Sequence, residues 1–323
     1  MSNSWFRAAA AGAMSFVVIA APLAQVPSPA RGAPAAVINA RALMETVQTL
    51  ASADYEGRAA GTPGGAKARA WVRDRLQRLG LRPMGESFEH SFQISPRGRT
   101  AEPTSTTPAP AAGANLLALC AGTDPSLPVI VLSAHYDHVG IRDGRIYPGA
   151  DDNASGVATL LEIARLCVAQ PFRHGLVIAA LDGEEVGLQG ARAFMADPPV
   201  AKDRIALDVN LDMIARGDKG EIYVSGLHHN PTLKPLVEPV AARAPIAVRF
   251  GHDLPGTGHE DWTMQSDHGV FHQAGVPFLY FGVEDHADYH QPTDTADRIN
   301  PNFFAKAAAV VLDTLRAIDA GLR

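Results

Sequence analysis

Residues 129–138 read Val129-Ile130-Val131-Leu132-Ser133-Ala134-His135-Tyr136-Asp137-His138, an apolar run that passes directly into ionisable side chains. The same change follows two later apolar runs. Residues 176–181 lead into Asp182-Gly183-Glu184-Glu185, and residues 205–211 lead into Asp212. Short runs rich in Val, Ile and Leu are typical of strands that are buried on both faces of a sheet. Open α/β sheets place their ligand crevice at the carboxyl ends of the strands, so these three ends indicate one functional site.

The remaining sequence alternates between strand and helix patterns. Further apolar runs predict strands over residues 88–94, 116–120, 222–225 and 276–281. Helices are predicted over residues 40–50, over a segment that follows the loop at 53–65 and ends at Gly80, over 156–169, and from Pro301 onward, with Asn300 as its N-cap. We expect an α/β fold of three layers, α/β/α, with a central, mostly parallel (mixed) sheet.

Two details of this prediction can be checked directly. In the helix over 156–169 we expect Val157, Leu160, Leu161, Ala164 and Val168 to face the core. The segment 97–113 is rich in Pro, Thr and Ala and lacks apolar periodicity, which indicates a surface loop. We therefore expect a single domain over residues 36–323.

Composition excludes several classes of protein. The chain has 323 residues, of which 46% are hydrophobic and 19% charged, which fits neither a disordered chain nor a multispan membrane protein. Lys plus Arg number 28 against 34 Asp plus Glu, a formal charge of −6, so nothing favours nucleic acid as a partner. The two cysteines, Cys120 and Cys167, are expected to be buried free thiols, although a disulfide between them stays open.

The N-terminus has the pattern of a secretory signal peptide over residues 1–35. An uncharged apolar run at residues 8–21 is followed by small residues and prolines up to Ala36, and we expect cleavage between residues 24 and 36. The run is shorter than the roughly 20 residues of a membrane span. An exported protein, periplasmic or extracellular and without a stable membrane anchor, is expected; an uncleaved anchor is the alternative.

The ionisable residues at the strand ends are those that bind divalent metals. Zinc takes His nitrogens and carboxylate oxygens, and a two-metal site needs a carboxylate that bridges ions about 3.5–4 Å apart. His135 and Asp137 project to the same side of an extended backbone, so one can bind a metal while the other orients it. Glu184 and Glu185 are adjacent and must point differently, so one can be a ligand and the other a base. The candidates are His135, Asp137, Asp151, Asp152, Glu184, Glu185, Asp212 and His290.

Five motifs follow one another along the chain. They are His135-Tyr136-Asp137, Gly149-Ala150-Asp151-Asp152-Asn153-Ala154-Ser155-Gly156, Asp182-Gly183-Glu184-Glu185, Asn210-Leu211-Asp212-Met213 and Tyr289-His290-Gln291-Pro292-Thr293-Asp294-Thr295. Together they resemble the M28 family of co-catalytic zinc aminopeptidases. The resemblance spans about residues 40 to 320, and the segments Glu56-Gly57-Arg58 and Ser266-Asp267-His268 also look like family features.

The resemblance implies a zinc-peptidase-like fold with its ligands at the carboxyl ends of strands, and two Zn²⁺ per chain. One zinc ion would be held by His135 and Asp212, the other by Glu185 and His290, with Asp151 bridging them.

The resemblance also implies catalytic roles. Glu184 would be the general base, Asp137 would orient His135, and Tyr289 would lie near the oxyanion. A cis peptide would follow the bridging aspartate, between Asp151 and Asp152. The remaining histidines at 138, 252, 259, 268 and 286 are expected at the surface or in supporting positions.

The function expected from this resemblance is an exported aminopeptidase. It would hydrolyse N-terminal residues from peptides with a free N-terminus by means of metal-activated water, with Glu184 as the base. Three alternatives stay open: a carboxypeptidase on the same fold, a glutaminyl cyclase that uses one zinc ion, and a non-catalytic, receptor-like binding module. The oligomeric state is left open.

Overall fold

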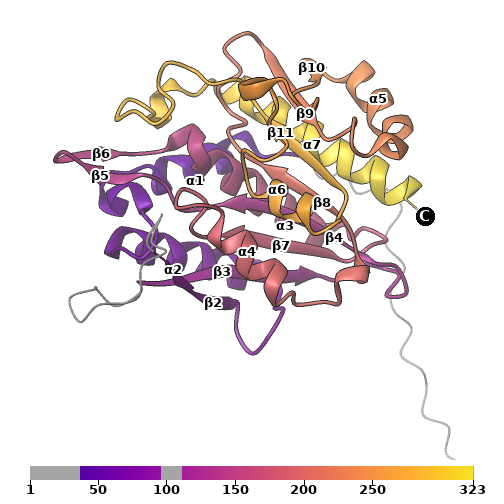
Figure 1. Cartoon of the computed structure of the whole chain (residues 1–323), viewed down its shortest axis with the longest axis horizontal. Coiled ribbons are helices and arrows are strands. Elements are labelled where there is room, and N and C mark those ends of the chain that lie inside the picture. Colours follow the sequence, from indigo (N-terminus) through magenta and orange to yellow (C-terminus); the bar gives the residue numbers. More distant parts are fainter. Residues whose placement is uncertain (1–36, 96–110, 323) are drawn as a thin grey trace, which may run out of the picture. The chain divides into compact units, whose positions relative to one another are not determined.

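The structure is a computed structural model that describes residues 37–95 and 111–322. Its central element is a mixed sheet. Its strand order is β1-β3-β7-β4-β8-β11-β9-β10, and β2 also pairs with β3 (Figure 1). The predicted signal peptide and residues 97–110 of the predicted loop lie outside the described residues. The strands are β1 (Arg82–Pro83), β2 (Glu89–Ile94), β3 (Ala111–Cys120), β4 (Val129–His135), β7 (Leu176–Leu181), β8 (Ile205–Leu211), β9 (Glu221–Ser225), β10 (Ala247–Phe250) and β11 (Phe278–Gly282).

The centre of the sheet is parallel and its flanks include antiparallel pairs. Strands β7, β4, β8 and β11 run parallel in that order, whereas β3 is antiparallel to β7 and β9 is antiparallel to β11. His135 is in register with Leu181, and Leu211 with Phe281, so the carboxyl ends of the parallel strands lie at one edge. A separate hairpin, β5 (Gly140–Arg142) and β6 (Arg145–Tyr147), follows β4.

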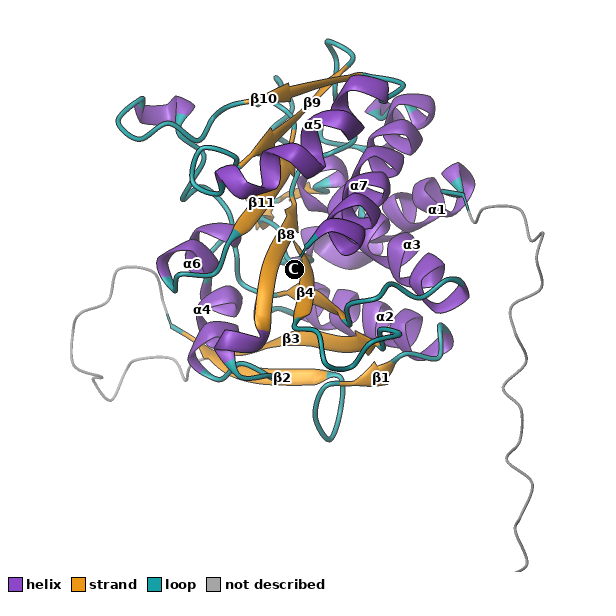
Figure 2. Cartoon of the chain, turned by 90° about the vertical axis from the view of Figure 1, so that its right-hand side faces the viewer, coloured by secondary structure: helices purple, strands orange, loops and turns teal. Residues whose placement is uncertain are grey.

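Helices cover both faces of the sheet, which confirms the predicted three-layer α/β/α fold. Figure 2 shows α1 (Ala40–Leu50), α2 (Pro63–Arg78), α3 (Gly156–Ala169) and α7 (Pro301–Gly321) on one face and α4 (Gln189–Ala196) and α6 (His268–Gln273) on the other. The first face packs around Leu43, Leu160 and Phe304, the second around Phe194 and Phe271. Helix α5 (Lys234–Arg243) packs against α7. No helix within the described residues is long and apolar enough to cross a membrane.

The predicted helix ends are explained by their caps. The Asn39 side chain accepts hydrogen bonds from two amides of α1, and Asn300 does the same for α7, where Pro301 is the first residue. Inside α3, however, the prediction that Val168 faces the core is wrong: its side chain is 46% exposed. Three residues after Ala164 the helix returns Cys167 to the sheet, so Val168 lies about 100° further round, toward solvent.

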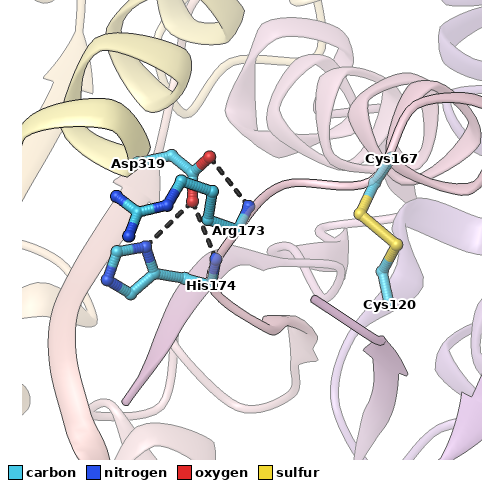
Figure 3. Close-up of a disulfide and its surroundings, with 5 residues drawn as sticks. All are labelled: Cys120, Cys167, Arg173, His174 and Asp319. Atoms are coloured by element: carbon cyan, nitrogen blue, oxygen red, sulfur yellow. Dashed lines mark hydrogen bonds and ion pairs between the residues drawn. A yellow bond between two sulfur atoms is a disulfide. The ribbon is translucent and has the colours of Figure 1, made fainter. Parts of the chain in front are cut away.

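The prediction of free thiols is also wrong, because Cys120 and Cys167 form a disulfide (Figure 3). Cys120 is the last residue of β3 and Cys167 lies in the last turn of α3, and their Cα atoms are 6.4 Å apart, within reach of a disulfide. The cause is packing: α3 lies across the sheet, so residues 47 positions apart in sequence meet in the core.

A second link joins α7 to the segment that precedes β7. The Asp319 carboxylate accepts hydrogen bonds from the backbone amides of Arg173 and His174, and it lies 2.9 Å from His174 Nδ1 (Figure 3). This contact and the disulfide both fix helices that lie on the same face of the sheet.

Candidate functional site

The ionisable residues singled out in the sequence come from several separate segments. His135 is the last residue of β4, Asp212 follows β8, and Glu184 and Glu185 follow β7. Asp152 lies in the irregular turn at Ala150–Ser155 that leads into α3, and His290 lies between β11 and α7. The parallel centre of the sheet brings these segments to one edge.

Three side chains form a first cluster of potential metal ligands. His135 Nε2 lies 3.2 Å from Asp212 Oδ1 and 3.4 Å from Asp152 Oδ1. All three side chains are buried. Their atoms are close enough together to hold one metal ion.

A second cluster shares Asp152 with the first. His290 Nε2 lies 3.0 Å from Asp152 Oδ2 and 3.2 Å from Glu185 Oε1. His138, expected at the surface or in a supporting position, is buried and belongs to this cluster, with Nδ1 2.7 Å from Glu185 Oε1. Asp152 thus presents Oδ1 to one cluster and Oδ2 to the other, which is the arrangement required of a bridging carboxylate.

Asp151, the residue expected to bridge the two ions, lies in neither cluster. One of its oxygens accepts a hydrogen bond from the Ala215 amide at 2.7 Å, and the other lies 3.2 Å from His286 Nε2. Consecutive side chains of this turn point apart, so Asp151 faces the loop after β8 while Asp152 faces the two clusters. The bridging role is accordingly reassigned to Asp152. The cis peptide also lies one position later than expected, between Asp152 and Asn153.

The Asp137 carboxylate connects His135 with the two glutamates. Its Oδ1 lies 3.6 Å from His135 Nδ1, and the Asp137 carbonyl oxygen is 3.2 Å from the same nitrogen. The two carboxylate oxygens also accept hydrogen bonds from the amides of Glu184, at 3.1 Å, and Glu185, at 3.4 Å. Asp137 therefore fixes both the His135 ring and the loop that carries the glutamates, and the second of these contacts was not predicted.

Glu184 and Tyr289 line a pocket next to the clusters. Burial, reinforced by nearby carboxylates, raises the pKa of Glu184 well above its ordinary value, which makes the carboxylate a better proton acceptor. The Tyr289 ring stacks on that of His290, with centroids 4.0 Å apart, and burial raises the pKa of its hydroxyl. The pocket is lined by Asp152, Glu184, Asp212, Met213, Trp262, Gln265, Tyr280, Val283, Asp285, Tyr289 and His290.

Two residues that the sequence analysis left without a role hold the turn that carries Asp152. The Asp294 carboxylate accepts hydrogen bonds from the amides of Asp151 and Asp152, and burial raises its pKa to about 6. The Arg58 guanidinium is fully buried and donates to backbone carbonyls of Tyr136, Leu50, Pro148 and Gly149, with a longer contact to Asp152. Both lie in motifs noted above, but only the folded chain shows what they contact.

The buried polar atoms of the two clusters fit a metal site. Within the described chain, both ring nitrogens of His138 and the Oε1 of Glu185 are buried without a hydrogen-bond partner. The carboxylate of Asp152 lies within 4.8 Å of that of Glu185 in one cluster and of that of Asp212 in the other, and burial raises the pKa of Asp152. Divalent cations would supply both the missing partners and the missing positive charge, and His with carboxylate ligands suits zinc.

The chain is similar to known proteins in sequence and in fold. The aminopeptidase YwaD of Bacillus subtilis is 28% identical over 193 residues, which is 57% of this chain and 39% of that protein. A zinc aminopeptidase structure from Bacillus subtilis has a TM-score of 0.66 at 17% identity and covers 87% of this chain and 95% of that one. A glutaminyl cyclase from Porphyromonas gingivalis has a TM-score of 0.68 at 22% identity, covering 87% and 99%.

Matches to eight curated relatives cover between 20% and 67% of those proteins' length. The family model that matches it is described as peptidase family M28 and aligns with residues 115–315. This match takes in β3 to α7, including every residue of the two clusters, and it confirms the resemblance noted in the sequence. The chain belongs to peptidase family M28.

Proposed function

We propose that this chain is an exported aminopeptidase that uses two zinc ions. The observation that carries the proposal is Asp152, whose two oxygens face two separate clusters of potential ligands. Asp152, His135 and Asp212 would hold one ion, and Asp152, Glu185 and His290 the other.

The residues around the clusters suit peptide hydrolysis. Two bound zinc ions would supply positive charge that lowers the pKa of a water molecule and polarises the scissile carbonyl. Glu184, with its raised pKa, would accept the proton of the attacking water and deliver it to the leaving amine. Tyr289 would donate a hydrogen bond to the oxyanion, and Asp137 would keep Glu184 in place through its backbone amide.

The charge of the pocket favours a substrate with a free amino terminus. The residues that line it include Asp152, Glu184, Asp212 and Asp285 but neither Lys nor Arg among those described. Such a lining attracts an ammonium group and repels a carboxylate. This favours an aminopeptidase over a carboxypeptidase, which needs a cationic group for the substrate's C-terminus.

Two observations support export. One is the apolar run at residues 8–21 with its pattern of a signal peptide. The other is the disulfide between Cys120 and Cys167, a bond that persists mainly in oxidising compartments. We expect mass spectrometry of the exported protein to place its first residue between positions 25 and 36; an intact Met1 in that protein would contradict the proposal.

The deciding experiment compares amino-terminal hydrolysis with cyclisation. The purified protein, freed of metal and reloaded with zinc, is assayed with a panel of aminoacyl-nitroanilides and with a peptide that begins with glutamine. We expect two zinc ions per chain by elemental analysis, release of nitroaniline, and no cleavage of N-acetylated substrates. One zinc ion together with pyroglutamate formation would instead favour a glutaminyl cyclase, the second candidate, because a cyclase shares this fold.

A further inference from the structure

His138 is a buried histidine to which the ligand assignment above gives no role. Its side chain is 1% exposed, and no described residue hydrogen-bonds to either ring nitrogen. The ring does lie at ion-pair distance from two carboxylates, and such a buried arrangement without a well-oriented hydrogen bond is destabilising unless a cation lies between the groups.

The geometry shows where that nitrogen points. His138 Nδ1 lies 2.7 Å from Glu185 Oε1 and 3.5 Å from Asp152 Oδ2. Glu185 Oε1 also has no hydrogen-bond partner in the described part of the chain. The same two carboxylate oxygens lie 3.2 Å and 3.0 Å from His290 Nε2. Ligand atoms on one tetrahedral zinc ion lie about 3.3 Å apart, given bonds of about 2.0–2.2 Å. The four distances given above, 2.7 to 3.5 Å, lie around this value, and all four ligand atoms lie within 4.8 Å of one another.

The position of the ring is fixed by its neighbours. Gly149 packs directly against it, since a Cβ at that position would lie 2.5 Å from ring atoms Cγ and Cδ2 of His138. The His138 amide donates a hydrogen bond to the Arg58 carbonyl at 3.4 Å. These contacts hold the His138 ring in the interior, whereas the His290 side chain is 35% exposed.

We propose that His138, through Nδ1, is a fourth protein ligand of the ion held by Asp152, Glu185 and His290. The inference rests on the two-zinc site of the proposed function and makes that site asymmetric. One ion has four protein ligands, whereas the ion at His135, Asp152 and Asp212 has three. Closed four-ligand zinc sites are typically structural, and three-ligand sites keep a position open for water or substrate. The four-ligand ion therefore binds more tightly and is loaded first, and the three-ligand ion is the one at which water is activated.

The first test is zinc affinity. Metal-free protein is titrated with zinc in competition with a chromogenic chelator, which gives a dissociation constant for each ion. We expect His138→Ala to weaken one ion by more than about 100-fold, beyond the 10–100-fold typical of residues that only orient a ligand. It should be the same ion that His290→Ala weakens, and the other ion should be unaffected. A smaller loss, or a loss at the ion weakened by His135→Ala, would overturn the proposal.

Two further variants complete the affinity test. His259→Ala, which removes an exposed histidine, is the matched control and should bind both ions normally. His138→Gln fills the buried space without an imidazole. It should show the same loss of zinc affinity, and it replaces the alanine variant in the test if that variant does not fold.

The second test measures the visible absorption spectrum of bound Co²⁺, which depends on the number and kind of its ligands. One equivalent of Co²⁺ added to the metal-free protein should give the intense visible bands of a four-coordinate ion, and His138→Gln should weaken or shift them. An unchanged spectrum would overturn the proposal. If the wild type binds two zinc ions and hydrolyses aminoacyl-nitroanilides while His138→Gln behaves like it in both tests, only this inference fails. If the wild type binds fewer than two zinc ions, the proposed function fails with it.

Discussion

At the residue scale, two adjacent glutamates occupy different environments although they share one partner. Asp137 accepts a hydrogen bond from the amide of each, while their side chains diverge: Glu185 faces His138 and His290, and Glu184 faces the pocket. This divergence is what the proposed function requires, in which Glu185 binds a metal ion and Glu184 transfers a proton.

We expect Glu184→Gln to keep near-normal zinc content and to lower kcat by at least the roughly 10²–10⁴-fold that general-base catalysis contributes. Glu185→Ala, the matched variant, should lose zinc and activity together. Elemental analysis and kcat are measured for both proteins side by side. If Glu184→Gln loses zinc while Glu185→Ala retains it, the two roles are reversed.

The neighbouring aspartates give a second prediction at this scale. Asp152→Asn should weaken the binding of both ions because its two oxygens face both clusters. Asp151→Asn should bind two ions, since Asp151 contacts the Ala215 amide and His286 instead. Zinc stoichiometry by elemental analysis distinguishes them, and normal zinc content in Asp152→Asn would refute the reassignment.

This reassignment shows what the sequence could not supply. Residues 150–155 contain two consecutive aspartates, and the motif identifies the turn without saying which of them points inward. His138 directly follows Asp137 just after β4, but the resemblance already implies five ligands and gives no role to this histidine. Both facts depend on side-chain direction in an irregular backbone, which periodicity does not determine.

At the scale of elements, the strongly periodic helices and the central strands were predictable. α1 begins and ends where its periodicity does, and β7 and β8 match their apolar runs residue by residue. The sequence did not predict β1, β5, β6, β10, α4, α5 and α6. Six of these have two to eight residues, which carry too little periodicity, and the ten-residue helix α5 contains Pro239. β3 begins at Ala111, five residues earlier than predicted, because β2 pairs with Ala111 to Leu116.

The disulfide gives a prediction at this scale. It closes a loop of 47 residues between β3 and α3, and loop closure of that length stabilises a folded protein by about 4 kcal/mol. We expect the double variant Cys120→Ala/Cys167→Ala to have a free energy of unfolding lower by about this amount, measured by denaturant unfolding. The oxidised and reduced wild type are measured alongside it. Equal stability of oxidised and reduced wild type would show that the bond contributes nothing.

At the scale of the whole molecule, zinc should stabilise the fold. The ligands come from β4, from the turn before α3 and from the loops after β7, β8 and β11, so the unfolded chain cannot bind as tightly. A ligand at 100 times its dissociation constant adds about 2.7 kcal/mol. We expect chelation to abolish activity and to lower the Tm by about 5–10 °C. An unchanged Tm and activity in protein confirmed to be metal-free would contradict the two-zinc proposal.

Among the groups that titrate, His268 should contribute a loss of stability in acid. Its ring is fully buried, with Nε2 2.9 Å from the Trp262 carbonyl oxygen, and burial lowers its pKa from 6.5 to about 4. Between these values the unfolded chain binds a proton that the folded chain does not. Folding free energy is therefore lost as pH falls through this range, by about 2 kcal/mol between pH 7 and pH 5.

The comparison uses metal-free protein. In zinc-loaded protein, protonation of the zinc ligands at low pH would release zinc and lower the stability by itself. His268→Gln should show a smaller loss of stability than the wild type between pH 7 and pH 5, measured by denaturant unfolding. Equal losses in the two proteins would show that His268 titrates normally in the folded state.

The buried Arg58 has a consequence for how the chain can be divided. The family model begins at residue 115, yet this guanidinium, from the segment between α1 and α2, contacts the backbone on both sides of the hairpin β5–β6 and at the turn that carries Asp152. A fragment trimmed to residues 115–315 would keep every residue of the two clusters and lose Arg58, which holds the backbone around them together. Arg58 lies more than 50 residues before the start of the matched range, so we expect a fragment that begins at residue 115 to be less stable than one that includes Arg58, and expression vectors should begin before it.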